Sequence, residues 1–96
     1  MKYNIPERVI RDITTYARNH DIRKVILFGS RANGTHTERS DIDIAVSGGD
    51  FDGFYWDINE NAHTLLSFDV VDIDLGVSDD LKIEIQRDGI IIYEKN

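Results

Sequence analysis

Two aspartates separated by one residue, Asp41 and Asp43, are the side chains of this sequence whose type and spacing could do chemistry. In an extended strand successive side chains alternate between faces, so these carboxylates share one face while Ile42 and Ile44 take the other. Like charges this close oppose each other's ionisation, and a divalent cation relieves that repulsion. Oxygen ligands suit Mg²⁺ or Mn²⁺. An Asp-x-Asp pair alone, however, is more typical of two solvent-facing strand residues than of a metal site, because acidic residues are mostly exposed.

A glycine-serine turn, Gly29-Ser30, ends an apolar run of sequence upstream of these aspartates, and ten residues separate Ser30 from Asp41. Glycine lets the backbone approach a phosphate closely, and the first amide groups of a helix offer it donors and the positive end of a dipole. The Ser30 hydroxyl and Arg31 could add contacts to the β- and γ-phosphates. Taken alone, the turn could simply end a strand, and only its distance from Asp41 favours a nucleotide-binding loop, with contacts from Gly29, Ser30, Arg31 and Arg39.

The sequence around these residues predicts helices and strands in alternation. Apolar residues recur at helical spacing in two segments, the second of them with Asp50 as its expected N-cap. A third helix is expected from its N-cap Ser78 and its end at Gly89. A short helical turn is expected at Ser30. The expected helices cover 6–19, 51–67 and 79–87, and the expected strands cover 24–28, 41–46, 68–75 and 90–93. This order predicts an α/β fold: a short mixed sheet of about four strands, helices mainly on one face, and the carboxylates on the open face.

Length and composition restrict the class of protein. A chain of 96 residues suits one domain, here residues 1–96. Eighteen acidic against 11 basic side chains give a net charge of -7, which disfavours direct binding of nucleic acid. The absence of cysteine excludes disulfides and thiol catalysis. Since no apolar run approaches the ~20 residues of a membrane helix, we expect a cytoplasmic protein without a membrane partner.

The glycine-serine turn, the ten intervening residues and the Asp-x-Asp pair match the signature of the nucleotidyltransferase superfamily with a DNA polymerase β-like palm. The longer stretches, 27–34 and 40–46, resemble its small stand-alone branch, the minimal nucleotidyltransferases. The resemblance continues in 68–72 and 81–93 and is weakest over 51–66. It implies the polymerase β palm-like fold and metal-dependent transfer of a nucleotide, with ATP as the substrate.

The resemblance also implies a set of site residues. Asp41 and Asp43 would bridge two Mg²⁺ or Mn²⁺ ions, and a third carboxylate on a neighbouring strand would bind the catalytic metal and take the acceptor's proton. The family's pattern of two aspartates around two hydrophobic residues places this third carboxylate at Asp69. Asp72 is out of phase with Asp69 and is the alternative if the register differs. Asp74 is expected at the surface.

The resemblance finally implies a partner. Minimal nucleotidyltransferases are commonly paired with a small helical HEPN protein, and in such pairs the transferase moves AMP from ATP onto a tyrosine of the HEPN ribonuclease and silences it. The chain would then be the antitoxin, a protein adenylyltransferase, and its partner would be encoded by an adjacent gene. Two alternatives stay open: a non-catalytic module that neutralises a partner by contact, and a transferase acting on a small molecule or an RNA end.

Two further kinds of side chain bear on these alternatives. Trp56 falls off the apolar stripe of its helix, so it is either partly exposed or a contact for a partner. The three histidines lack the spacing of a metal site and are interpreted as structural. Of these, only His36 lies in the expected phosphate loop, where it could touch the substrate.

Overall fold

Four strands form one mixed sheet in the order β3-β2-β1-β4 in the computed structural model, which describes residues 4–96. The central strands β1 (Lys24–Phe28) and β2 (Ile42–Ser47) are antiparallel. The edge strand β4 (Ile90–Glu94) is antiparallel to β1, and the other edge strand β3 (Phe68–Asp72) is parallel to β2. The predicted α/β class with a mixed sheet of four strands is confirmed.

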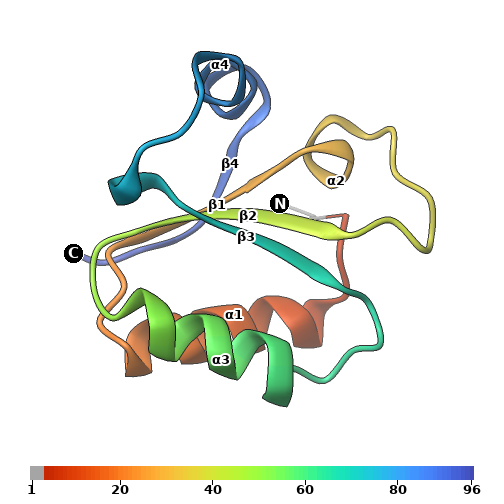
Figure 1. Ribbon diagram of the computed structural model, residues 1–96. Helices are drawn as coiled ribbons and strands as arrows, with labels where there is room; N and C mark the ends of the chain where they lie inside the picture. The colour runs from red at the N-terminus through yellow and green to blue at the C-terminus, as the bar shows by residue number, and fades with distance from the viewer. Residues whose placement is uncertain (1–3) are drawn as a thin grey trace.

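Two long helices, α1 (Glu7–Asn19) and α3 (Phe51–Asn61), cover one face of the sheet (Figure 1). Their apolar stripes and the inward side chains of β1 and β2 form the core. The shorter helices α2 (Ser30–Asn33) and α4 (Asp79–Asp88) lie on the other side of the sheet (Figure 1). None of the helices within residues 4–96 has both the length and the apolar character needed to cross a membrane. The fully buried large side chains of the core are Val9, Ile13, Ile22, Val25, Leu27, Ile42, Ile44, Val46, Phe54 and Ile58.

Helix α3 is shorter than its apolar spacing predicts, because the chain leaves the helix at Ala62, where the backbone is extended with φ −64° and ψ 142°. Asp12 of α1 accepts a hydrogen bond from the His63 N–H at 2.7 Å and fixes this exit. The chain must then reach the start of β3, parallel to β2, and Leu65 on the way is fully exposed. The predicted end of this helix at residue 67 is therefore wrong.

Strand β3 also ends earlier than predicted, at Asp72 instead of residue 75. The Asp72 carboxylate accepts the N–H of Asp74 at 3.0 Å and starts a 3₁₀ turn, η1 (Ile73–Leu75). The exposed Asp74 carboxylate in turn accepts the Gly48 N–H at 2.7 Å, which ties this turn to the end of β2. Asp72 and Asp74, whose spacing suggested a longer strand, thus use their carboxylates to accept backbone N–H groups at the end of the strand.

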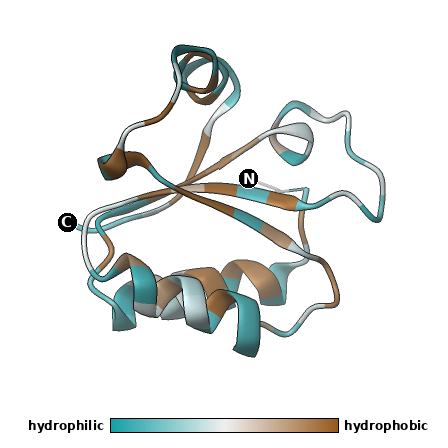
Figure 2. Cartoon of the chain, in the orientation of Figure 1, coloured by the Kyte–Doolittle hydropathy of each residue, from teal (hydrophilic) through white to brown (hydrophobic). Residues whose placement is uncertain are grey.

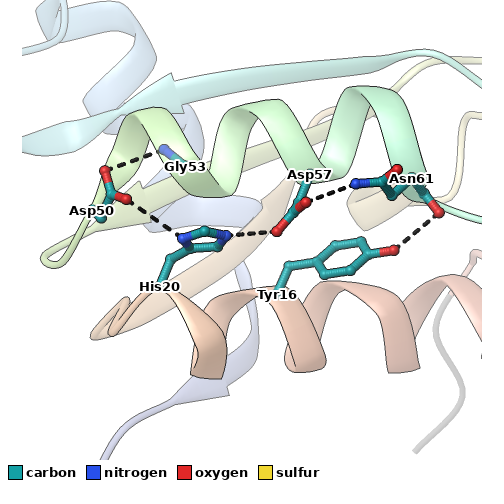
Figure 3. Close-up of polar contacts among 6 residues, drawn as sticks. All are labelled: Tyr16, His20, Asp50, Gly53, Asp57 and Asn61. Atoms are coloured by element: carbon teal, nitrogen blue, oxygen red, sulfur yellow. Dashed lines mark hydrogen bonds and ion pairs between the residues drawn. The ribbon is translucent and has the colours of Figure 1, made fainter.

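A row of polar contacts joins α1 to α3 (Figure 3). His20 Nε2 lies 2.6 Å from Asp57 Oδ2, and His20 Nδ1 lies 3.4 Å from a carboxylate oxygen of Asp50. Tyr16 donates a hydrogen bond to the Asn61 carbonyl at 2.9 Å, and the Asn61 side chain donates to Asp57 at 2.7 Å. Tyr16 and His20 share a helix face because they are four residues apart. His20 therefore holds the two covering helices together.

Replacement of Asp57 by asparagine is expected to lower the Tm by about 4–8 °C at neutral pH. Hydrogen bonds from His20 and Asn61 hold the pKa of the Asp57 carboxyl below its ordinary value of 3.8. A lowered carboxyl pKa stabilises the fold above the ordinary value, and this stabilisation is lost as the pH falls below it. Thermal unfolding at several pH values measures the effect.

The exposed Glu60 on the same helix provides the control, since Glu60→Gln should leave the Tm within about 2 °C of native, as expected for a surface substitution. A Tm difference between native and Asp57→Asn that persists unchanged below the ordinary carboxyl range would contradict this interpretation of the contacts.

Candidate active site

The structure brings three of the predicted aspartates together on one face of the sheet. Asp43 of β2 pairs with Asp69 of β3 in the parallel ladder, so both side chains leave the sheet on the same face. Asp41 directly precedes β2, and the alternation of the backbone returns it to that face. Ile42, between them, is fully buried in the core. Figure 2 shows the paired strands as largely hydrophobic, each with a short hydrophilic stretch.

The electrostatics of Asp43 reflect this crowding of carboxylates. Burial, followed by the charges of Asp69, Asp41 and Glu84, raises the pKa of Asp43 from 3.8 to about 6. Each cause disfavours the ionised carboxylate, and a bound cation would favour it. The face therefore carries negative charge that a bound cation would neutralise.

Gly29 brings the glycine-serine turn against the same aspartates. Phe28, the residue before it, pairs with Asp43 in the β1–β2 ladder. Gly29 has φ +73°, and a Cβ at this position would overlap Asp43 Oδ2 and lie 3.0 Å from Asp43 Cγ. Only glycine allows both this backbone conformation and this close approach. The ten-residue distance between the turn and the aspartates in the sequence motif thus corresponds to direct packing of the turn on Asp43.

The protein family described as "Polymerase beta, Nucleotidyltransferase" matches residues 11–96. The chain belongs to this family. The resemblance of the motifs to the nucleotidyltransferase superfamily is thereby confirmed, and the match includes the turn at Gly29 and all three aspartates of the candidate site.

Solved structures of toxin–antitoxin proteins share the fold. A crystal structure of a toxin–antitoxin with AMP-PNP matches with a TM-score of 0.70 and 25% sequence identity, over 91% of this chain and 74% of that chain. The toxin–antitoxin MntA-HepT matches with a TM-score of 0.64 and 22% identity, over 94% of this chain and 74% of that chain. The polymerase β-like nucleotidyltransferase fold predicted from the motifs is therefore confirmed.

A curated relative from Methanocaldococcus jannaschii is named "Putative protein adenylyltransferase MJ0604". It is 62% identical over 32 residues, which make up 32% of this chain and 32% of the relative. The match thus spans about a third of the length of that protein.

Within this nucleotidyltransferase domain, the two candidates for the third carboxylate occupy different positions. Asp69 faces Asp43 across the strand pair, whereas Asp72 pairs with Val46, a buried residue of the core. The Asp72 carboxylate is engaged in capping η1 through the N–H of Asp74. The geometry favours Asp69, and its role as a metal ligand stays a prediction.

Glu84 is a further carboxylate near the site that the sequence motifs do not include. It belongs to α4, which lies on the same side of the sheet as α2 (Figure 1), and its negative charge contributes to the raised pKa of Asp43. Nothing in the local sequence distinguishes Glu84 from the other acidic residues of this helix. Its position depends on the packing of α4 over the sheet.

Arg31 lies differently from the phosphate-contacting residue expected from the sequence. Its side chain is 4% exposed, and its guanidinium donates four hydrogen bonds to the main-chain carbonyl oxygens of Asn4, Thr37, Glu38 and Ser40. These contacts direct the side chain to the loop. The predicted contact of Arg31 with a nucleotide stays a prediction. The observed hydrogen bonds hold the backbone of the loop before Asp41 instead.

Ser30 and Arg39 are the other predicted nucleotide contacts. Ser30 is the half-buried first residue of α2, directly after Gly29. Arg39 is exposed in the loop, where its N–H donates to the Thr37 hydroxyl at 3.3 Å. Both positions are compatible with a ligand at the turn, and both assignments stay predictions.

The donor set fits a magnesium or manganese ion whose coordination is completed by substrate. Among residues 4–96, no three carboxylate or imidazole side chains already converge into a group that could hold a metal. Mg²⁺ seldom uses such a cage; it is usually held by one or two carboxylates together with waters and substrate phosphates. Asp41, Asp43 and Asp69 offer only oxygen ligands, beside a turn suited to phosphates. We therefore expect metal and nucleotide to bind together.

Proposed function

We propose that this chain is a metal-dependent nucleotidyltransferase that transfers AMP from ATP to a partner protein, as the antitoxin of a HEPN/MNT toxin–antitoxin pair. The observation that carries the proposal is the packing of the Gly29 turn on Asp43, with Asp41 and Asp69 on the same face. The relative from Methanocaldococcus jannaschii supports the protein acceptor by its name. The toxin–antitoxin structure with AMP-PNP supports an adenine nucleotide as the substrate.

In the proposed reaction, a hydroxyl oxygen of the partner attacks the α-phosphorus of ATP, and the bond from this phosphorus to the oxygen that bridges to the β-phosphate breaks. The turn at Gly29 and Ser30 would bind the phosphates, and pyrophosphate leaves. Asp69 would accept the proton of the attacking hydroxyl. Asp41, Asp43 and Asp69 would hold Mg²⁺ or Mn²⁺, which neutralises the attacking and leaving oxygens when bound.

Mass spectrometry of the intact partner tests the proposal. The chain is incubated with ATP, Mg²⁺ and the helical HEPN-type protein encoded by an adjacent gene. We expect the partner to gain the mass of AMP, with its tyrosine as the modified residue. An increase by one phosphate would show a kinase, and an unchanged partner that nevertheless forms a complex would favour the contact antitoxin.

The exposed side chain of Trp56 favours a second candidate function, a module that neutralises its partner by contact alone. Trp56 is 66% exposed on α3, and its neighbour Tyr55 is 44% exposed. Large exposed aromatic side chains are typical of protein interfaces. Asp43→Asn distinguishes the two functions, since a contact antitoxin would still protect cells from the toxin and a catalytic antitoxin would not.

A further inference from the structure

Arg31 is the one charged or polar residue among residues 4–96 that is buried, with 4% of its surface exposed. A buried charge is costly unless its hydrogen-bonding groups are satisfied. Its Nε donates to the Ser40 carbonyl at 3.0 Å, and its Nη2 donates to the carbonyls of Glu38 and Thr37 at 3.1 and 3.3 Å. The guanidinium therefore holds the last residues of the loop before Asp41.

A second pair of hydrogen bonds joins the side chain and the backbone of Arg31 to Asn4. Nη1 of Arg31 donates to the Asn4 carbonyl at 2.6 Å, and the Asn4 side chain donates to the Arg31 carbonyl at 2.7 Å. Arg31 itself belongs to α2, which begins directly after Gly29. The residue thus links three segments: the start of the described chain, the glycine-serine turn and the loop.

The loop depends on this link. The other hydrogen bonds that residues 37–40 make within the described chain all run inside the loop. The Thr37 N–H donates to Ser40 Oγ at 2.9 Å, the Ser40 N–H donates to the Thr37 carbonyl at 3.2 Å, the Arg39 N–H donates to the Thr37 hydroxyl at 3.3 Å, and the Thr37 and Ser40 hydroxyls lie 3.3 Å apart. Asp41 follows the loop and precedes the first paired residue of β2. Without the guanidinium, the described residues 37–40 that lead into Asp41 would keep only hydrogen bonds within the loop.

We propose that Arg31 is a positioning residue that fixes Asp41 relative to the Gly29 turn. This inference rests on the proposed function, because it explains how the glycine-serine turn and the proposed metal ligand Asp41 keep their relative position across the polar loop. A planar guanidinium reaches carbonyl groups in several directions at once, which the single ammonium group of lysine does not. Arg31→Lys therefore keeps the charge and removes the link.

Hydrogen exchange of the chain alone, without nucleotide or partner, tests the proposal. In Arg31→Lys, peptides covering residues 35–42 should exchange about tenfold faster than in the native chain, since hydrogen bonds from a charged donor are lost. Peptides of α1 and α3 should keep their native rates. Arg8→Lys, at an exposed position of α1, is the control and should exchange as the native chain does. Native exchange in the loop, or faster exchange throughout the chain, would overturn the positioning role.

Steady-state kinetics of AMP transfer supply a second readout. Misplacement of Asp41 should lower kcat by about 100-fold and leave the KM for ATP within about threefold of native. Guanidinium ion added to Arg31→Ala should restore part of the lost kcat. A raised KM with native kcat would overturn the proposal in favour of a phosphate contact. If the native chain transfers no AMP, the proposed function fails while the exchange experiment still decides the role of Arg31.

Discussion

Asp43→Asn is expected to lower the rate of AMP transfer by about 10³-fold or more while the chain remains folded. Asp43 lies opposite Asp69 in the β2–β3 ladder and against Gly29. Asparagine keeps the shape of the side chain and removes the negative charge that a metal ion requires. Initial rates with α-labelled ATP measure the loss, and Glu60→Gln is the control. A variant within tenfold of the native rate would show that Asp43 does not hold a metal needed for transfer.

The same replacement should stabilise the metal-free chain at neutral pH. The pKa of Asp43 is raised to about 6, so the folded state binds a proton more tightly than the unfolded state does. The fold therefore loses stability as the pH rises from the ordinary value of 3.8 through about 6, and the full penalty is present above that. Asparagine removes the penalty.

Thermal unfolding in EDTA, from about pH 4 to about pH 8, measures this effect. The Tm of Asp43→Asn should exceed that of the native chain at the upper end, and the difference should shrink as the pH falls. Added Mn²⁺ should raise the Tm of the native chain more than that of the variant, because the ion needs the carboxylate. A difference independent of both pH and Mn²⁺ would contradict the electrostatic account.

Gly29→Ala is expected to lower the rate of AMP transfer by about 100-fold, because its Cβ would push the turn and Asp43 apart. The backbone at Gly29, with φ +73° and ψ −157°, is open essentially only to glycine, and alanine there adds a cost of about 1–3 kcal/mol to the free energy of folding. Gly34→Ala is the control. Gly34 also has a positive φ, +87°, in the left-handed conformation, but nothing lies within 4 Å of a Cβ built there.

The two glycine variants distinguish the effect of backbone strain from the effect of the steric overlap with Asp43. Gly29→Ala should lose more Tm than Gly34→Ala, because the overlap with Asp43 adds to the backbone strain, and only Gly29→Ala should lose the larger part of its activity. Measurement of Tm and initial rate for both variants gives the answer. Equal losses of activity in the two would contradict the direct packing of Gly29 on Asp43 as the reason for the motif.

The sequence predicts strand β2 well, with Asp43 in it and Asp41 directly before it, because alternation of side chains depends only on local geometry. The N-caps at Asp50 and Ser78 are confirmed for the same reason, since their side chains accept from Gly53 and Leu81 nearby in the chain. Side-chain alternation and helix capping, which are local in the sequence, therefore predict most of the helices and strands and the pair of aspartates.

Contacts between distant segments explain what the sequence did not predict. The end of α3 depends on Asp12, which is 51 residues from its partner His63. The role of Arg31 depends on carbonyl groups of the loop and of Asn4, and no residue pattern marks them. The approach of Glu84 to Asp43 depends on how α4 packs. Sequence motifs identify the candidate residues of a site, and tertiary contacts determine which of these residues can reach a ligand.

Transfer of label from α-³²P-ATP to the adjacent HEPN-type protein, with Mg²⁺, tests AMP transfer by these carboxylates when the native chain, Asp69→Asn and Asp72→Asn are compared in parallel. We expect a labelled partner with the native chain and with Asp72→Asn, and none with Asp69→Asn. Equal labelling by Asp69→Asn and the native chain would rule out Asp69 as the third carboxylate, and a native chain that binds its partner and never labels it would rule out the transferase.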